Sequence, residues 1–393
     1  MFFKYSGWLS EIIVSAVNFF GNKEIDLGIN FMSILLPIGI SFYTFQALSY
    51  IVDVYKSKIE PETHIGYYAL YISFFPQLVA GPIERAGDLV PQFKAESKFT
   101  KSNFTEGAKT LLWGFFKKIV IADTLGLYCV KVFSDVFNPQ WSGVDYLISM
   151  PIFAYYLYCD FSGYCDIAIG SARWFNIKLT NNFNKPFSSL NFRVFWSRWH
   201  ITLSVWVKDY VYLPMGGRYG NSKVRSFINV IVSFIIVGVW HGASFNFLMF
   251  GLIAGLYVVI DFSTKDLRLT FFSRIGLIRI KWLYDFLCRF STFIVFCSLS
   301  IFYCLKDINE TSLFLQHLFD FSNKPNILIA DFMIMLGLIV VLESANYITP
   351  EGGDYPFAGI KNDFIRISVY TMIIFAIVLL ADRGSETFHY FQF

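Results

Sequence analysis

The sequence has 393 residues, of which 55% are hydrophobic, 20% are aromatic and only 16% are charged. Soluble domains carry about 25% charged residues, so this composition excludes an ordinary soluble fold and indicates a chain embedded in lipid. The net charge of +3 at pH 7 is small and gives no indication of nucleic-acid binding.

Apolar segments long enough for a membrane follow one another along the chain. Shorter or broken runs occupy 29–52, 65–80 and 107–122, and longer ones occupy 143–172, 226–240, 245–260, 290–305, 327–342 and 366–381. Pro76 and the pair Gly81-Pro82 predict a broken backbone, which survives at membrane depth only inside protein or beside a wet cavity. Frequent glycines in the runs are typical of closely packed membrane helices. The sequence therefore predicts an all-α polytopic integral membrane protein with about nine or ten membrane-embedded helices, some of them re-entrant or interfacial.

Lysine and arginine are concentrated in two parts of the chain. Nine of them lie in 173–225 against one acid, Asp209, and six more lie in 263–289. Two apolar runs separate these parts, so both belong on one face of the membrane, which the positive-inside rule assigns to the cytoplasm. The sequence predicts a multi-pass protein of the cytoplasmic (inner) membrane, in contact with its lipids.

The stretch 190–214, LNFRVFWSRWHITLSVWVKDYVYLP, predicts a helix with a polar stripe and an aromatic body. Such a helix suits a membrane interface, where the stripe faces water, or the wall of a polar tunnel. In the second case Arg193, Arg198 or Lys208 would bind the phosphates of a nucleotide-like donor, because arginine binds them bidentately. On a helix, the stripe consists of Arg193, Ser197, His200, Ser204 and Lys208.

His241 stands at the end of the apolar run FINVIVSFIIVGVW, where a titratable side chain is expensive to desolvate and indicates function. Gly242 and Ala243 follow it and leave space around the ring. One interpretation is a buried histidine that is hydrogen-bonded to a carbonyl or to a serine such as Ser244. The other is catalysis, because a neutral imidazole sheltered from water accepts a proton from a hydroxyl nucleophile. The residues alone leave both interpretations open.

The remaining polar and sulfur-containing residues give weaker signals. Asp160 and Asp166 are six residues apart and do not share a helix face, so we expect them to solvate a cavity, to pair with basic residues of 185–208 or to orient a histidine. The asparagines of LTNNFNKPF are most simply turn formers before Pro186. The six cysteines form no CxxC pair, so we interpret them as small buried hydrophobes and expect no metal site.

Taken together, several stretches of the sequence resemble one family, and they occur in the family's order over nearly the whole chain. They are PIGISFYTFQALSYIVDVY (37–55), FFPQLVAGPIER (74–85), FSGYCDIAIG (161–170), NFNKPF with FWSRWHITLSVWVKDYVYLPMGG (182–217), VGVWHGASFNFLMFG (237–251) and the terminal YFQF. The chain resembles the membrane-bound O-acyltransferases, in the branch of alginate and peptidoglycan O-acetyltransferases, with teichoic-acid D-alanyl transfer proteins as more distant relatives.

The resemblance implies a single membrane domain over 1–393, with a ring of helices around a thin central funnel. Family members carry more hydrophobic segments before the stretch that is similar to FFKYSGW, which here begins at residue 2, so we expect those N-terminal segments to be missing. By motif, His241 matches the family's central catalytic histidine. His200 matches a second histidine on the cytoplasmic side.

We therefore expect transfer of a short acyl group, acetyl from acetyl-CoA or from another acyl thioester, to a hydroxyl at the outer face. This would O-acetylate a cell-envelope or exported polysaccharide, with no bound cofactor and with an exported O-acetyltransferase as partner protein. His241 would act as general base or as transient acyl carrier, and His200 would position the thioester or relay a proton. Trp240 or a backbone N–H near Gly242 would stabilise the oxyanion.

Two alternatives stay open from the sequence. In one, a carrier protein delivers a D-alanyl group, and the basic residues of 193–225 bind the acidic face of that carrier. In the other, the chain is a polysaccharide or lipid transporter without chemistry of its own, although it lacks paired half-helices in two symmetric halves.

Overall fold

The computed structural model describes residues 39–217, 222–349, 355–357 and 360–381, with five isolated positions before residue 19. Within these residues the chain forms helices and turns and no β-strand, which confirms the all-α class. The longer helices are α2 (Ile40–Tyr55), α3 (Ile65–Ser73), α4 (Ala86–Lys94), α5 (Lys101–Phe115), α6 (Asp123–Ser134), α7 (Gly143–Trp174), α10 (Lys223–His241), α11 (Phe245–Ser263), α12 (Lys265–Arg274), α13 (Lys281–Cys304), α14 (Ile308–His317), α15 (Ile329–Ile348) and α16 (Asp363–Leu380). The shorter elements are the π-helices η2 (Phe116–Ala122) and η4 (Lys208–Tyr212), the 3-10 turns η3 (Pro186–Ser188) and η5 (Leu277–Arg279), and the helices α8 (Phe192–Trp196) and α9 (Ile201–Val207).

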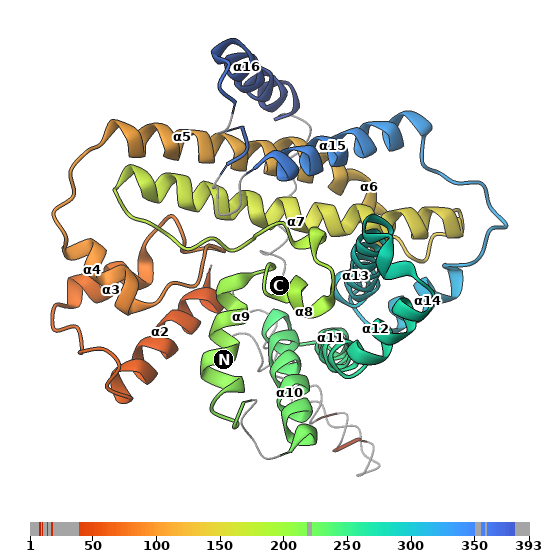
Figure 1. Ribbon diagram of the computed structural model, residues 1–393, viewed down its shortest axis with the longest axis horizontal. Helices are drawn as coiled ribbons and strands as arrows, with labels where there is room; N and C mark the ends of the chain where they lie inside the picture. The colour runs from red at the N-terminus through yellow and green to blue at the C-terminus, as the bar shows by residue number, and fades with distance from the viewer. Residues whose placement is uncertain are drawn as a thin grey trace.

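Two long antiparallel segments, α5–η2–α6 and α7, form the backbone of the fold and run side by side in Figure 1. Glycines at the contact allow the helices to approach closely, as expected from the sequence. A Cβ on Gly163 of α7 would lie 2.9 Å from the carbonyl oxygen of Gly114, and a Cβ on Gly114 would lie 2.7 Å from that of Gly163. Gly107 and Gly170 repeat this arrangement seven residues away, each at 2.6 Å.

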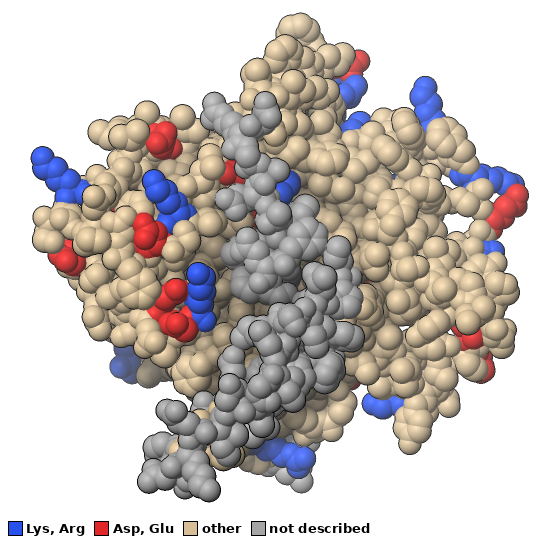
Figure 2. Space-filling model, turned by 180° about the vertical axis from the view of Figure 1, so that it is seen from behind, with Lys and Arg blue, Asp and Glu red and all other residues tan. Residues whose placement is uncertain are grey.

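Five of the described helices are long and apolar enough to cross a membrane: α10, α11, α13, α15 and α16. The most hydrophobic windows of α15 and α16 are only 17% and 6% buried within the protein, so these helices present apolar side chains outward, as lipid-facing helices do. Much of the face seen in Figure 2 is likewise uncharged. A multi-pass membrane protein is therefore confirmed, whereas the expected number of nine or ten embedded segments stays a prediction.

The predicted break in the backbone is present between α3 and α4. Residues 74–85 form turns and extended chain, and most of them are buried inside the protein. Tyrosine hydroxyls from neighbouring helices donate to main-chain carbonyls of this segment, Tyr164 to Pro76 at 3.3 Å and Tyr71 to Glu84 at 3.0 Å. Protein groups thus satisfy the backbone that the prolines and glycine release, which is the condition for such a segment at membrane depth.

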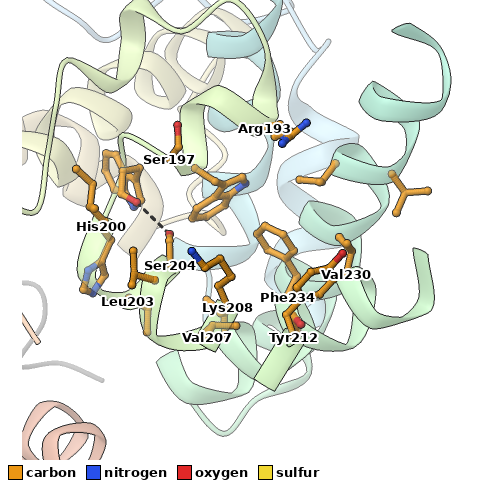
Figure 3. Close-up of a pocket in the computed structure, with 18 of the residues that line it drawn as sticks. Arg193, Ser197, His200, Leu203, Ser204, Val207, Lys208, Tyr212, Val230 and Phe234 are labelled. Atoms are coloured by element: carbon orange, nitrogen blue, oxygen red, sulfur yellow. Dashed lines mark hydrogen bonds between the residues drawn. The ribbon is translucent and has the colours of Figure 1, made fainter. Parts of the chain in front are cut away.

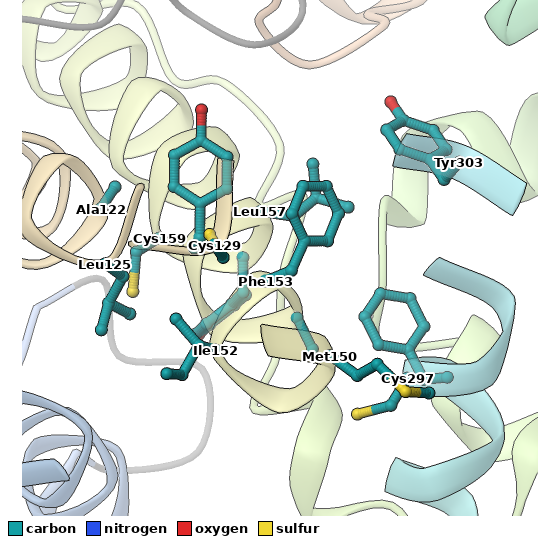
Figure 4. Close-up of a cluster of buried hydrophobic side chains, with 14 of the residues drawn as sticks. Ala122, Leu125, Cys129, Met150, Ile152, Phe153, Leu157, Cys159, Cys297 and Tyr303 are labelled. Atoms are coloured by element: carbon teal, nitrogen blue, oxygen red, sulfur yellow. The ribbon is translucent and has the colours of Figure 1, made fainter. Parts of the chain in front are cut away.

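Side chains from η2, α6, α7 and α13 form the large hydrophobic core shown in Figure 4. Cys129, Cys159 and Cys297 are buried in it, as expected of cysteines that serve as small hydrophobes. This core packs against α8 and α11, which carry part of the wall of the cavity described below.

The aspartates of α7 pair differently from what the sequence suggested. Lys118 lies 2.7 Å from Asp160 and 2.8 Å from Asp123, and Lys117 lies 2.8 Å from Asp166. These lysines come from η2, whereas the expected ion-pair partners were basic residues of 185–208, one of three roles that the sequence suggested for the aspartates. A π-helix has a smaller turn angle per residue than an α-helix, which lets two consecutive lysines both face α7.

Candidate active site

A cavity of about 510 Å³ lies between the segment that contains α8, α9 and η4 and the helices α10 and α11. Its walls are mainly valine, leucine and aromatic side chains, with a few polar groups among them, as is typical of ligand cavities. Figure 3 shows Lys208 and Ser204 on one side and Phe234 on the other, with His200 at the edge beside Leu203. The polar lining residues are Arg193, Ser197, His200, Ser204, Lys208, Tyr212, Ser226, Ser233 and His241.

All five residues of the predicted polar stripe line this cavity, but they do not lie on one helix. The helix is interrupted at His200, which has φ 43° and ψ 56°, in the left-handed region that non-glycine residues rarely adopt. The interruption divides the stretch into α8 and α9. The expectation of one continuous helix was therefore wrong, whereas the grouping of its polar residues is confirmed.

His200 is 2% exposed and is held by Asn182. The Oδ1 of Asn182 accepts the main-chain N–H of Thr202 at 3.1 Å and its hydroxyl at 2.8 Å, so this amide oxygen must face the histidine side. His200 Nδ1 lies 3.3 Å from the same oxygen and is therefore the protonated nitrogen, which leaves a lone pair on Nε2. Nε2 has no hydrogen-bond partner among the described residues, and burial lowers the pKa of His200 to about 3. The ring stays neutral at physiological pH.

The His200 ring lies among aromatic side chains that connect it to His241. Phe161 is 4.7 Å away between ring centroids and Trp240 is 6.1 Å away, and Trp240 lies 4.8 Å from His241. In Figure 3 the imidazole of His200 points away from Lys208 and Phe234. The two histidines thus flank one tryptophan, although 40 residues separate them in the sequence.

His241 is the last residue of α10 and is 8% exposed. The hydroxyl of Tyr303 lies 3.5 Å from its Nδ1, and the Tyr303 ring packs edge-on at 5.1 Å. Ser244 does not bond the imidazole but caps α11 by accepting the N–H of Phe247 at 3.4 Å. The space expected beside Gly242 is filled, because the Phe247 ring occupies the place of a Cβ at that position.

The cavity follows α10 from its first turn to its last. Ser226 and His241 both line it and are 15 residues apart, a rise of about 22 Å along the helix. Lys208 and Tyr212 lie toward the Ser226 end, since Ser226 and Asn229 near the start of α10 donate hydrogen bonds to the turn that directly follows η4, and the Lys208 side chain is exposed. One end of the cavity is therefore cationic and open, whereas the other is buried and carries two imidazoles.

Two other predicted site residues, Arg198 and Trp240, are placed differently from what their predicted roles require. Arg198 is not part of the cavity lining, which includes Arg193 and Lys208. The indole N–H of Trp240 donates to the carbonyl of Ser41 at 3.3 Å. This donor therefore already has an acceptor and is not directed at an oxyanion. Among the described residues no group of three His, Cys, Asp or Glu side chains is arranged to hold a metal ion.

Asn182 and Tyr303 complete the surroundings of the two histidines, and sequence reasoning missed both. Asn182 was interpreted as a turn former, but it is 1% exposed and organises the loop beside His200. Tyr303 lies 62 residues after His241, so only the packing of α13 against α11 brings it near. The one available signal was the position of Asn182 inside a motif that resembles the family.

The chain matches one known protein family over most of its length. The profile of the membrane-bound O-acyltransferase family (MBOAT) matches residues 62–305, which include the whole cavity lining. The chain belongs to this family. Its segment from α3 to the end of α13 is thus the part that membrane-bound O-acyltransferases share.

Individual relatives differ in their named activities. The chain is 36% identical over 302 residues to a Pseudomonas aeruginosa protein named probable alginate O-acetylase AlgI, covering 75% of this chain and 54% of that protein. It is 38% identical over 254 residues to the peptidoglycan O-acetyltransferase of Helicobacter pylori, covering 57% and 47%. It is 30% identical over 226 residues to the teichoic acid D-alanyltransferase of Bacillus subtilis, covering 55% and 56%. The chain spans about half the length of the curated relatives it matches.

Proposed function

We propose that this membrane-bound O-acyltransferase transfers a short acyl group, acetyl, from a cytoplasmic thioester such as acetyl-CoA to a hydroxyl at the outer side of the membrane. The proposal rests on one cavity that has the exposed Lys208 toward one end and His241 with His200 at the other, with Arg193 also in its lining. The names of the relatives with the higher identities, O-acetylases of alginate and of peptidoglycan, support acetyl as the group and a polysaccharide as the acceptor.

The open end of the cavity suits the donor. Arg193 and Lys208 are exposed and positively charged, and phosphate groups of a nucleotide-like donor are negatively charged. Between them and the histidines the walls are apolar, formed in part by Val230, Phe234 and Val237, which suits the long uncharged arm of a thioester. His200 is neutral and offers an acceptor lone pair on Nε2, so it would position the donor by accepting a hydrogen bond from an amide N–H of the donor's arm rather than by binding the thioester itself. Arg198 would contact the donor outside this cavity.

At the buried end, His241 is the group that accepts the proton. The acceptor hydroxyl oxygen forms a bond to the thioester carbonyl carbon, its proton passes to the imidazole, and the carbon–sulfur bond breaks. The departing thiolate then takes the proton and leaves as a thiol through the open end. An acetyl group held transiently on His241 would be the same chemistry in two steps.

The expected topology brings the two substrates to opposite ends. With the basic loops at the cytoplasmic face, α10 begins inside and His241 lies about 27 Å further along its axis, close to the thickness of about 30 Å of the hydrocarbon core. We include α7, whose 32 residues are about 48 Å long, and the segment α5–η2–α6 in the ring of nine or ten embedded helices. The location is then the cytoplasmic (inner) membrane, and an exported O-acetyltransferase receives the acyl group.

The test is acetate released by alkali from separated peptidoglycan and exopolysaccharide fractions. The strains are the parent, a deletion, and the deletion carrying wild type, His241→Ala or His64→Asn at matched abundance in the membrane. His64 is an exposed histidine that caps α3, and asparagine keeps that cap, so His64→Asn is the matched control. We expect acetate to fall in one fraction and to return with wild type and the control. His241→Ala should restore less than about 1% of it, since general-base catalysis contributes 10²–10⁴-fold.

Other outcomes contradict the proposal in distinct ways. Full restoration by His241→Ala would make the histidine structural and would favour a transporter. Unchanged acetate in all fractions of the deletion would exclude acetyl as the group. In that case D-alanine released from teichoic acids is the next measurement, because D-alanyltransferases are among the relatives.

A further inference from the structure

Tyr303 is the polar residue that meets His241 from the end of α13. Its hydroxyl lies 3.5 Å from Nδ1, and the whole residue is 3% exposed. The two rings are nearly perpendicular, at 77°, so the hydroxyl approaches the edge of the imidazole where Nδ1 is located. Phe247 and Phe250 pack against both rings at centroid distances between 5.5 and 6.3 Å and restrict their rotation.

A separate contact fixes the end of α13 relative to His241. Asn246, in the first turn of α11 and fully buried, donates to the carbonyl of Leu305 at 2.8 Å and to that of Asp307 at 3.0 Å. The last carbonyls of a helix lack partners within the helix, so this amide caps α13. Only four residues separate His241 from Asn246, and Tyr303 is two residues before Leu305. Asn246 thereby fixes the end of α13, which carries Tyr303, relative to the end of α10, which carries His241.

The tautomer of His241 decides which chemistry it can perform. A neutral imidazole carries its proton on one nitrogen, and the other nitrogen is the base. A hydroxyl can accept a hydrogen bond as well as donate one, so Tyr303 can hold the proton on Nδ1. Such a partner on the second nitrogen is the usual means by which proteins select a histidine tautomer.

We propose that the Tyr303 hydroxyl accepts a hydrogen bond from Nδ1–H of His241 and thereby keeps Nε2 as the base that faces the acceptor hydroxyl. Tyr303 is a positioning residue that acts through His241, and this role rests on the proposed function. During transfer the Nδ1 proton stays in place, and only Nε2 gains and loses a proton.

Acyl transfer by the purified full chain in lipid nanodiscs tests the effect on rate, with acetyl-CoA as donor, the exported O-acetyltransferase partner as acceptor and released CoA thiol as the measured product. Tyr303→Phe keeps the ring and removes the hydroxyl, and we expect kcat to fall about 2- to 12-fold at unchanged KM for the donor. Tyr284→Phe, on the same helix but outside the site, is the matched control and should behave as wild type. An unchanged kcat in Tyr303→Phe, or a loss seen only as a higher KM, would overturn the proposal.

A spectroscopic readout separates this proposal from the proposed function. Solid-state NMR of protein labelled with ¹⁵N-histidine distinguishes protonated from unprotonated ring nitrogens, and the difference from His241→Ala assigns the signals. We expect wild-type His241 to be protonated at Nδ1 and Tyr303→Phe to show a mixture of tautomers. Protonation at Nε2 in wild type overturns the proposal even if acyl transfer is confirmed. If wild-type His241 is protonated at Nδ1 but no acyl transfer occurs, the positioning of His241 by Tyr303 stands and the proposed function is overturned.

Discussion

Replacing Lys118 with methionine should destabilise the protein strongly, because this side chain is the centre of a buried charge cluster. Its ammonium group contacts Asp160 at 2.7 Å and Asp123 at 2.8 Å, and the side chain is only 9% exposed. Lys118→Met leaves two carboxylates facing each other, with Asp160 1% and Asp123 15% exposed. Neither can recover its hydration without opening the contact between η2 and α7.

The size of the effect follows from this burial. Breaking a buried ion pair from one side costs about 3–5 kcal/mol, because the remaining charge is left without compensation. A change of that size lowers the melting midpoint by about 4–6 °C in a chain of this length, because the unfolding entropy scales with the number of residues. The midpoint is measured by fluorescence-detected size-exclusion chromatography of detergent-purified protein after heating.

Two variants make the measurement specific. Lys98→Met removes a lysine that is 75% exposed and pairs only with Glu96 at the surface, so its midpoint should stay within about 1 °C of wild type. Adding Asp160→Asn and Asp123→Asn to Lys118→Met removes the two carboxylate charges that the ammonium had balanced and should recover most of the loss. A Lys118→Met midpoint equal to that of Lys98→Met, or a triple variant no better than the single one, would refute the reasoning.

Two further predictions concern the backbone of the fold. Burial raises the pKa of Glu84 from 4.5 to about 7, so the folded protein favours the protonated form. The free energy of unfolding is therefore unaffected below pH 4.5 and falls as the pH rises from 4.5 to 7. Above pH 7 it is lower by about 3 kcal/mol. Glu84→Gln should remove this decline when melting midpoints are measured from pH 4.5 to 8, and Glu96→Gln, at an exposed position, is the control. Midpoints of wild type and Glu84→Gln that change with pH in parallel would contradict the prediction. Gly163→Ala places a Cβ 2.9 Å from the Gly114 carbonyl and should cost about 1–3 kcal/mol in thermal stability, whereas Gly337→Ala, which meets nothing within 4 Å, should cost none. Equal midpoints for the two glycine variants would show that α5 and α7 can separate without cost.

The apolar helices and the break between α3 and α4 could be predicted from the sequence because their causes are local. The length of an apolar run decides whether a helix can cross a membrane, and five such runs form helices of that kind. Proline removes a backbone donor wherever it stands, and the break at 74–85 coincides with Pro76 and Gly81-Pro82, whereas the single Pro151 is accommodated inside α7. The importance of His241 was visible for the same reason, since an ionisable group beside an apolar run is costly in any fold.

The partners of these residues were decided only by the tertiary structure. The stretch 190–214 has a period that suits one helix, yet Asn182 holds His200 in a left-handed conformation and divides it. Asp160 pairs with Lys118 because two glycine contacts bring α5 and α7 close enough for a π-helix to turn its lysines inward. Tyr303 reaches His241 only through the packing of α13 on α11. A sequence specifies which groups need a partner when they are buried, but the choice among distant partners depends on how closely the helices approach.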